Sequence, residues 1–216
     1  MFITFEGIEG SGKSTQSRMT FDHLQQRGVP ALWTRQPGGC DLGSRLRALL
    51  LGREGDGLTP LSELFLYLAD RTQHVAEVIR PALAAGTVVL CDRFTDSTVA
   101  YQGYGRGLDV SLIHRLNAVA VDGCLPDLTL ILDLPVETGL NRARTRNADQ
   151  GQTESEGRFE AEETAFHQRI RDGYLTLAAD NPDRYAVIPA QGDPEEVFGR
   201  VWPMVCSRLG IAEHLL

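Results

Sequence analysis

Short apolar runs alternate with longer amphipathic stretches along most of the chain. Runs of four or five residues that are apolar almost throughout predict β-strands buried on both faces. The predicted strands lie at Met1–Phe5, Ala31–Thr34, Thr87–Cys91, Leu128–Leu132 and Tyr185–Ile188.

The stretches between these runs have helical patterns with recognisable ends. Gly28 suits the position just after a helix, and Pro60 suits a first helical turn. Pro81 predicts a disturbance inside the helix that begins near Pro60. The predicted helices run from the first strand's loop to near Gly28, from Pro60 towards Gly86, from Asp109 to about Asp122, from Pro135 to about Arg146 and from Asp193 to Leu209.

Strands that alternate with helices imply a parallel, doubly wound sheet of the α/β class, here with five strands. In such sheets, ligands bind beyond the carboxyl ends of the strands. Arg35, the pair Asp92–Arg93 and Asp133 each follow a predicted strand directly. We therefore expect these ionisable side chains along the functional edge of the sheet.

The segment Asn147–Gly157 breaks this alternation, because it is polar and rich in glycine, glutamine and acidic residues. Arginines bracket it at positions 142, 144, 146 and 158. It is either a disordered surface loop with solvated charges or a mobile lid whose arginines close over phosphates and exclude water. With 216 residues and no linker, the chain is expected to form a single domain, 1–216, with this lid as an insert at about 142–160.

Residues 7–14 match the phosphate-binding pattern G-x-x-x-x-G-K-[ST] between a predicted strand and a predicted helix. Glycines let the backbone curl, and its N–H groups with the following helix N-terminus form an anion site. An ordinary glycine-rich turn explains this pattern poorly. The expected nucleotide-binding residues are Gly7, Ile8, Glu9, Gly10, Ser11, Gly12, Lys13, Ser14 and Thr15.

Three side chains of this loop have separate expected roles. Lys13 would place its charge on the β- and γ-phosphates of the nucleotide, and the Ser14 hydroxyl would reach a phosphate-bound Mg²⁺. Phosphates repel a carboxylate at Glu9. Glu9 must therefore contact a metal, an arginine or a sugar hydroxyl, or point to solvent.

Composition and charge limit the classes of binding partner that can be expected for this chain. The formal net charge is −8 and the isoelectric point is about 5.1, which argues against nucleic-acid or polyanionic membrane surfaces. No apolar run approaches the ~20 residues of a membrane span, and the N-terminus shows no basic leader. The cysteines at 40, 91, 124 and 206 have no C-x-x-C spacing and are expected to be buried free thiols of a cytoplasmic protein.

A phosphate-binding loop alone does not define the reaction. A GTPase switch would need a base-reading motif such as N-K-x-D, which is absent from the sequence. A small-molecule kinase needs a second anionic pocket, for which Arg35, Arg71 and Arg93 are candidates. Planar guanidinium groups suit bidentate phosphate binding, and phosphoryl transfer depends mostly on positioning and charge neutralisation.

Six segments form an ordered set of motifs, namely Phe5–Gln16, Thr34–Gly39, Tyr67–Arg71, Asp92–Phe94, Ser97–Gly103 and Asn141–Arg144. This set resembles the bacterial thymidylate kinases, a family of P-loop nucleoside monophosphate kinases. One position departs from the family pattern, because Gln36 stands where the family usually has Glu. The resemblance covers the chain from the first strand to the last helix and implies the three-layer α/β/α P-loop kinase fold.

The resemblance implies residue roles in an acceptor site for dTMP. Tyr67 would stack on the thymine unless it is a core aromatic, and Arg71, one turn further on, would reach a base carbonyl. The resemblance further implies that Arg35 and Arg93 bind the acceptor phosphate, and that Thr98 and Gln102 form hydrogen bonds to the base or sugar. Tyr101 would exclude a ribose 2′-hydroxyl, and Glu9 would lie near the sugar or metal. Asp92 would act on the phosphates through Mg²⁺ or orient Arg93.

The resemblance also implies a source for the transition-state cation. Some family members place a basic residue inside the loop, but here Glu9, Gly10 and Ser11 occupy those positions. The lid is then expected to supply the cation, from either Arg146 or Arg158. Gln36 keeps the shape of Glu but loses its charge, and we expect activity to survive.

The implied activity is transfer of the γ-phosphoryl group of ATP to dTMP with Mg²⁺, in dTTP biosynthesis. The family forms homodimers, for which apolar surface around Leu64–Leu68 and Val110–Val121 is a weak indication that core packing explains equally well. Two alternatives remain: a kinase for a deoxynucleoside or another nucleoside monophosphate, and a nucleotide-dependent switch without a second substrate.

Overall fold

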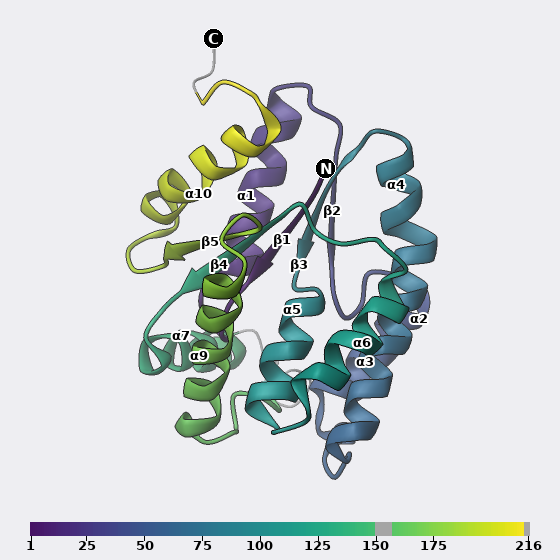
Figure 1. Ribbon diagram of the computed structural model, residues 1–216. Coiled ribbons are helices and arrows are strands. Elements are labelled where there is room, and N and C mark those ends of the chain that lie inside the picture. Colours follow the sequence, from purple (N-terminus) through teal and green to yellow (C-terminus); the bar gives the residue numbers. More distant parts are fainter. Residues whose placement is uncertain (150–156, 214–216) are drawn as a thin grey trace.

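Five parallel strands form one sheet in the computed structural model, which describes residues 1–149 and 157–213 (Figure 1). The order across the sheet is β2-β3-β1-β4-β5. The five-stranded parallel sheet predicted from the sequence is thereby confirmed. The strands are β1 (Phe2–Glu6), β2 (Ala31–Arg35), β3 (Val88–Asp92), β4 (Leu128–Asp133) and β5 (Tyr185–Pro189).

Helices cover both faces of the sheet and complete a three-layer α/β/α architecture (Figure 1). One layer holds α1 and α10, which pack against each other. The other holds the helices from α3 to α6 together with α9. The helices are α1 (Lys13–Gln26), α2 (Asp41–Leu51), η1 (Arg53–Gly55), α3 (Pro60–His74), η2 (Val75–Ile79), α4 (Arg80–Ala84), α5 (Thr95–Thr98), η3 (Val99–Gly105), α6 (Val110–Val121), α7 (Val136–Asp149), α9 (Thr164–Asp180) and α10 (Pro194–Leu209).

The strand side chains alternate between the two layers, as the two-residue repeat of a strand requires. Ile3 and Phe5 of β1 belong to the apolar cluster under α1 and α10. Phe2, from the same strand, packs on the opposite face with Phe94, and their ring centroids are 4.9 Å apart. The continuous apolar runs of the sequence therefore reflect burial on both faces.

The strand register brings together the ionisable residues that were expected at the carboxyl edge. Arg35 at the end of β2 pairs with Asp92 at the end of β3, and Asp92 also stands opposite Phe5 of β1. Asp133 ends β4, where Arg171 of α9 binds its carboxylate through Nε at 2.7 Å. The phosphate-binding loop leaves β1 at this same edge.

Among the described residues, the helical segments that were not predicted from the sequence are α2, η1, the α5–η3 segment and α9. The helix from Pro60 also differs in detail from the prediction. Its disturbance is the wide π-helical turn η2, which precedes Pro81 rather than falling on it. Proline lacks an N–H and crowds the carbonyl four residues earlier, so the preceding turn opens.

The prediction that all four cysteines are buried is wrong for two of them. All four cysteines are free thiols, but only Cys91 and Cys206 are buried, while Cys40 and Cys124 are partly exposed.

Within the part of the chain that the structure describes, we find no helix of the length and apolarity that crossing a bilayer requires. Of the expected lid, residues 142–149 belong to α7, and residues 150–156 lie outside the described part.

Candidate active site

The loop between β1 and α1 owes its shape to three glycines. Gly7, Gly10 and Gly12 have φ angles of 137°, 68° and 93°, in the region that favours glycine. A Cβ at Gly10 would lie 2.0 Å from the carbonyl oxygen of Gly139, so the loop touches α7 directly. The loop therefore lies against the helix that carries Arg146.

Lys13 lies inside this loop, where its Nζ donates to the Ile8 carbonyl at 2.6 Å and to Ser11 Oγ at 3.3 Å. Burial and the nearby charge of Arg93 lower the pKa of Lys13 to about 7, and the negative charges around it only partly oppose this shift. A bound phosphate would add an anionic partner and favour the charged ammonium.

Ser14 and Asp92 meet beside Lys13, and the Ser14 hydroxyl donates to Asp92 Oδ2. Mg²⁺ accepts hydroxyl and carboxylate oxygens and commonly keeps waters and substrate phosphates as its other ligands. No group of three or more His, Cys, Asp or Glu side chains suited to a metal occurs among residues 1–149 and 157–213. Ser14 and Asp92 therefore fit a Mg²⁺ ion held largely by nucleotide phosphates.

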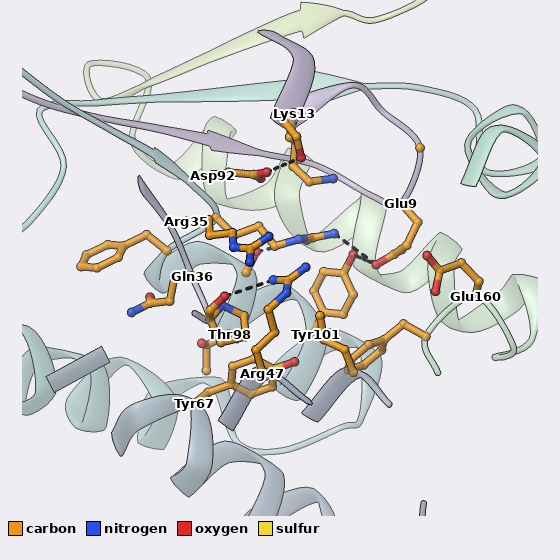
Figure 2. A pocket seen from close by; sticks show the side chains of 18 of the residues that line it. Glu9, Lys13, Arg35, Gln36, Arg47, Tyr67, Asp92, Thr98, Tyr101 and Glu160 are labelled. Atoms are coloured by element: carbon orange, nitrogen blue, oxygen red, sulfur yellow. Dashed lines mark hydrogen bonds and ion pairs between the residues drawn. The ribbon is translucent and has the colours of Figure 1, made fainter. Parts of the chain in front are cut away.

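A cavity of about 480 Å³ opens in front of these residues, a volume typical of small-molecule sites. Figure 2 shows Lys13 and Asp92 at one end of the cavity, Tyr67 at the other and Arg35 between them. Every residue expected to bind the acceptor lines this cavity, namely Glu9, Arg35, Tyr67, Arg71, Arg93, Thr98, Tyr101 and Gln102.

Arg93 lies at the centre of the site with a left-handed backbone, φ 67°, which is uncommon for a residue with a side chain. Its Nη2 donates to Glu9 Oε1 at 3.2 Å, and its guanidinium carbon lies 4.9 Å from the centroid of the Tyr101 ring. Glu9 also accepts a hydrogen bond from the Tyr101 hydroxyl. Of the alternatives open for Glu9, the structure supports contact with an arginine.

The Glu9 carboxylate is buried among donors. Burial alone would raise its pKa, but the hydrogen bond from His167 and the charges of Arg93 and Lys13 outweigh burial and hold the pKa below its ordinary value. The carboxylate therefore stays ionised and fixes the donors around it.

Arg71 is almost fully buried, and most of its donors are already engaged. Its Nε donates to Gln36 Oε1 at 2.7 Å, its Nη1 to Asn117 Oδ1 at 2.6 Å and its Nη2 to Thr98 Oγ1 at 2.8 Å. Burial lowers the pKa of Arg71 to about 10, which leaves it charged at neutral pH. Arg71 thus forms a rigid, cationic part of the cavity wall.

A buried carboxylate, that of Glu63, lies at the end of the cavity opposite the phosphate-binding loop. Gln102 Nε2 donates to Glu63 Oε1 at 2.8 Å, and Glu63 lies one helical turn before Tyr67 on α3. Burial and the charge of Glu63 raise the pKa of the Tyr67 hydroxyl, so it stays protonated. Tyr67 is partly exposed to the cavity, which is compatible with a ring that contacts a ligand.

The two candidate lid arginines have different surroundings. Arg146 lines the cavity, its side chain is 45% exposed, and its Nη2 lies 3.5 Å from Glu160 Oε1. The Arg158 side chain is only 8% exposed and pairs with Glu63 Oε2 at 2.6 Å. Arg158 Nη1 also donates to the Leu50 carbonyl at 2.9 Å. Arg158 therefore ties its segment to α2 and α3.

Comparisons with known proteins agree with this geometry. The family model described as Thymidylate kinase matches residues 5–201. The chain belongs to the thymidylate kinase family. It is 62% identical over 205 residues to the thymidylate kinase of Solidesulfovibrio magneticus, covering 95% of this chain and 98% of that protein. It is 61% identical over 201 residues to that of Oleidesulfovibrio alaskensis, covering 93% and 95% of the two chains.

A solved structure of the family has the same fold. The crystal structure of thymidylate kinase from Ehrlichia chaffeensis matches with a TM-score of 0.74 and 38% sequence identity. The match covers 95% of this chain and 97% of that chain. The P-loop kinase fold expected from the motifs is thereby confirmed.

A second cavity, of about 360 Å³, adjoins the phosphate-binding loop in this thymidylate kinase family member. The loop after β5 and the α7 arginines form it, with Arg142 Nη2 donating to the Gly192 carbonyl at 3.2 Å. Gln16 Nε2 donates to the Pro194 carbonyl at 2.8 Å and joins α1 to the first residue of α10. Arg146 lines both cavities and stands between them.

Sequence reasoning missed several residues at the site. Arg47 lines the main cavity from α2, a helix that was not predicted. Phe159 and Glu160 line it from the segment that follows the expected lid loop. His167 contacts Glu9 from α9, which was also not predicted. Lone basic, aromatic and acidic residues outside motifs give no signal that would single them out.

Proposed function

We propose that this protein transfers the γ-phosphoryl group of ATP to dTMP, giving ADP and dTDP. The observation that carries the proposal is a single cavity with a phosphate-binding loop at one end and two arginines, Arg35 and Arg93, facing it from the strand ends. A transferase needs these two anion sites to face each other so that both substrates meet without water between them.

At the donor end, the loop backbone and Lys13 hold the β- and γ-phosphates. Mg²⁺ held by Ser14, Asp92 and the phosphates would neutralise charge on the γ-phosphoryl group. The second cavity beside Arg142 would take the adenine, because it adjoins the loop and lies outside the acceptor cavity.

At the acceptor end, Arg35 and Arg93 would bind the dTMP phosphate, and Tyr67 would stack on the thymine with Arg71, Thr98 and Gln102 beside it. A phosphate oxygen of dTMP attacks the γ-phosphorus, and the bond from that phosphorus to the ADP oxygen breaks. No strong general base is required, since the attacking oxygen is already anionic.

We assign the transition-state cation to Arg146 rather than Arg158. Arg146 is half exposed between the donor and acceptor cavities. Among the described residues, its side chain is held by a 3.5 Å pair to Glu160 and by two hydrogen bonds to Oδ1 of the neighbouring Asn147. Arg158 would have to break a 2.6 Å ion pair to a buried carboxylate, which is costly. Arg158 instead anchors the end of the lid.

An acceptor panel tests this function against its alternatives. ADP release is measured with MgATP and dTMP, dUMP, dCMP, dGMP, AMP or thymidine, each at the same concentration. We expect dTMP to give the highest kcat/KM. Preference for another nucleotide or for thymidine would assign a related kinase, and tight ATP binding without acceptor-stimulated ADP release would assign a switch.

We also propose a homodimer through α3 and α6, which pack side by side. Leu64 and Leu68, the positions suggested by the sequence, are buried in the core instead. The apolar residues facing outward are Leu61 (45% exposed), Phe65 (53%) and Val119 (79%). We propose that these exposed apolar side chains belong to the dimer interface.

Sedimentation measures the oligomeric state. We expect a dimer for the wild type and a monomer for Phe65→Asp, with Met204→Asp on α10 as the exposed apolar control that stays dimeric. A monomeric wild type at tens of micromolar would refute the proposed interface.

The four free thiols fit a reducing compartment, so we place the enzyme in the cytoplasm.

A further inference from the structure

His167 lies fully buried on α9 between two oxygen acceptors. Its Nδ1 is 3.1 Å from Glu9 Oε2, and its Nε2 is 3.0 Å from the main-chain carbonyl oxygen of Phe159. A carbonyl can only accept a hydrogen bond, and so can an ionised carboxylate. Both contacts are therefore hydrogen bonds only when both ring nitrogens carry a proton.

Glu9 connects this ring to the acceptor site. Its Oε1 accepts from Arg93 and Tyr101, and its Oε2 accepts from His167. The carboxylate is therefore held by donors from three separate segments. Removing the contact from α9 would leave Oε2 without that donor and free the carboxylate to rotate away from Arg93 and Tyr101.

Phe159 connects the same ring to the segment of residues 157–163. The Phe159 ring packs edge-on against Tyr101, with the centroids 5.4 Å apart and an interplanar angle of 90°. The next residue, Glu160, pairs with Arg146. Glu9, Tyr101, Phe159 and His167 thus form a closed circuit of contacts that joins the phosphate-binding loop, η3, the 157–163 segment and α9.

We propose that His167 is a positioning residue whose two ring N–H groups couple Glu9 of the phosphate-binding loop to the 157–163 segment. Through Nδ1 it orients Glu9, and with it Arg93 and Tyr101, for the acceptor. Through Nε2 it holds the Phe159 main chain, and with it Glu160 and Arg146, for the transfer step. This inference rests on the proposed dTMP kinase function.

Two substitutions separate the two bonds. The amide nitrogen of His167→Asn stands near Nδ1 and keeps the bond to Glu9, whereas that of His167→Gln stands near Nε2 and keeps the bond to Phe159. A charge-assisted hydrogen bond corresponds to roughly a tenfold effect. We expect His167→Gln to raise the KM for dTMP roughly tenfold, and His167→Asn to lower kcat roughly tenfold with the KM for dTMP nearly unchanged.

The control is Gln168→Ala, an exposed α9 position whose kinetics should match the wild type. A merely structural role for His167 would change both kinetic parameters alike in the two variants, and that result would overturn the proposal. Wild-type kinetics in either variant would overturn it as well. A wild type without dTMP-dependent ADP release would instead refute the proposed function on which the inference rests.

The protonation state of the His167 ring can be measured in the wild-type protein by ¹⁵N NMR. The chain has five histidines, and loss of one ¹⁵N ring signal pair in His167→Asn assigns His167. At pH 7 we expect both His167 ring nitrogens to have the chemical shifts of protonated nitrogen. One unprotonated ring nitrogen at that pH would contradict the doubly donating arrangement and overturn the proposal.

Discussion

Arg71 donates its Nε hydrogen to Oε1 of Gln36 at 2.7 Å in the buried wall of the acceptor cavity. Gln36 stands where the thymidylate kinase family usually has Glu, and the amide oxygen makes the bond without a charge. Asp70 lies near this pair and is also buried. Burial raises the pKa of Asp70, and the N–H of Gly38, the charge of Arg71 and the Gln36 side chain oppose that shift.

Gln36→Glu should therefore leave activity largely intact. The new carboxylate strengthens the bond to Arg71, but it loses the amide donor and brings a second negative charge towards Asp70. We expect kcat/KM for dTMP to change by less than about threefold, because these two effects oppose each other. Steady-state kinetics at pH 7.5 measure this.

Gln36→Met provides the matched comparison, since it keeps the volume but removes the acceptor. An unpaired buried guanidinium N–H costs about 1–3 kcal/mol, so the free energy of unfolding should fall by that amount. A Gln36→Glu enzyme more than tenfold less active, or a Gln36→Met enzyme of unchanged stability, would contradict this role for Gln36.

Arg146→Ala should lower kcat by roughly 10³-fold, with little change in the KM for dTMP, because a positioned arginine acts mainly on the transition state. Arg158→Ala should instead lower stability by about 3–5 kcal/mol, because it leaves Glu63 as a buried carboxylate without its 2.6 Å partner. Kinetics and chemical denaturation on both variants separate these effects. The assignment is wrong if Arg158→Ala shows the larger kcat loss while remaining as stable as the wild type.

Tyr101→Phe removes only the hydroxyl that donates to Glu9. The ring remains packed on Phe159 and Phe166, so exclusion of a ribose 2′-hydroxyl should persist. We expect kcat/KM for dTMP to fall roughly tenfold while the preference for the deoxyribose over the ribose form of the nucleotide stays constant. If the preference collapses in this variant, the hydroxyl rather than the ring provides the discrimination.

The sequence predicted much of the sheet and of the phosphate-binding loop because these depend on local pattern. Buried strands leave continuous apolar runs, and the glycines of residues 7–14 stand at positions that need positive φ. By contrast, α9 has polar residues such as Arg169 and Gln168 among its apolar positions, and η3 is an irregular wide helix that contains two glycines. Their helical form depends on packing against other segments, which a local pattern does not contain.

The arginines of the site could likewise be predicted only in part from the sequence. Motifs predicted that Arg35, Arg71 and Arg93 would gather at one cavity, and they do. The proposed choice of Arg146 over Arg158 rests on Glu63, which is distant in sequence from both and pairs with Arg158. His167 could not be singled out at all, because its two acceptors are a distant carboxylate and a main-chain carbonyl.

His74 makes stability depend on pH. Burial, assisted by the charge of Arg71, lowers the pKa of His74 to about 4 from its ordinary value of 6.5. As the pH falls below 6.5 the unfolded chain takes up this proton and the folded chain does not, so stability is lost between about pH 6.5 and 4. At pH 5 the loss from this group is about 2 kcal/mol relative to pH 7.

Urea denaturation at pH 7 and pH 5 measures this loss. His74→Gln keeps a polar group for the Thr34 hydroxyl but does not titrate, so it should lose about 2 kcal/mol less than the wild type on acidification. Equal losses in the two proteins would show that other groups account for the acid sensitivity.

If one cavity joins the ATP site to the dTMP site, each ADP that forms should be matched by one dTDP. Phosphorus NMR of the wild type with MgATP follows ATP, ADP, dTDP and inorganic phosphate in one sample. We predict that ADP and dTDP appear together in a 1:1 ratio when dTMP is present, with negligible inorganic phosphate and no ADP without an acceptor. ADP formed with inorganic phosphate, at a rate independent of dTMP, would contradict the account.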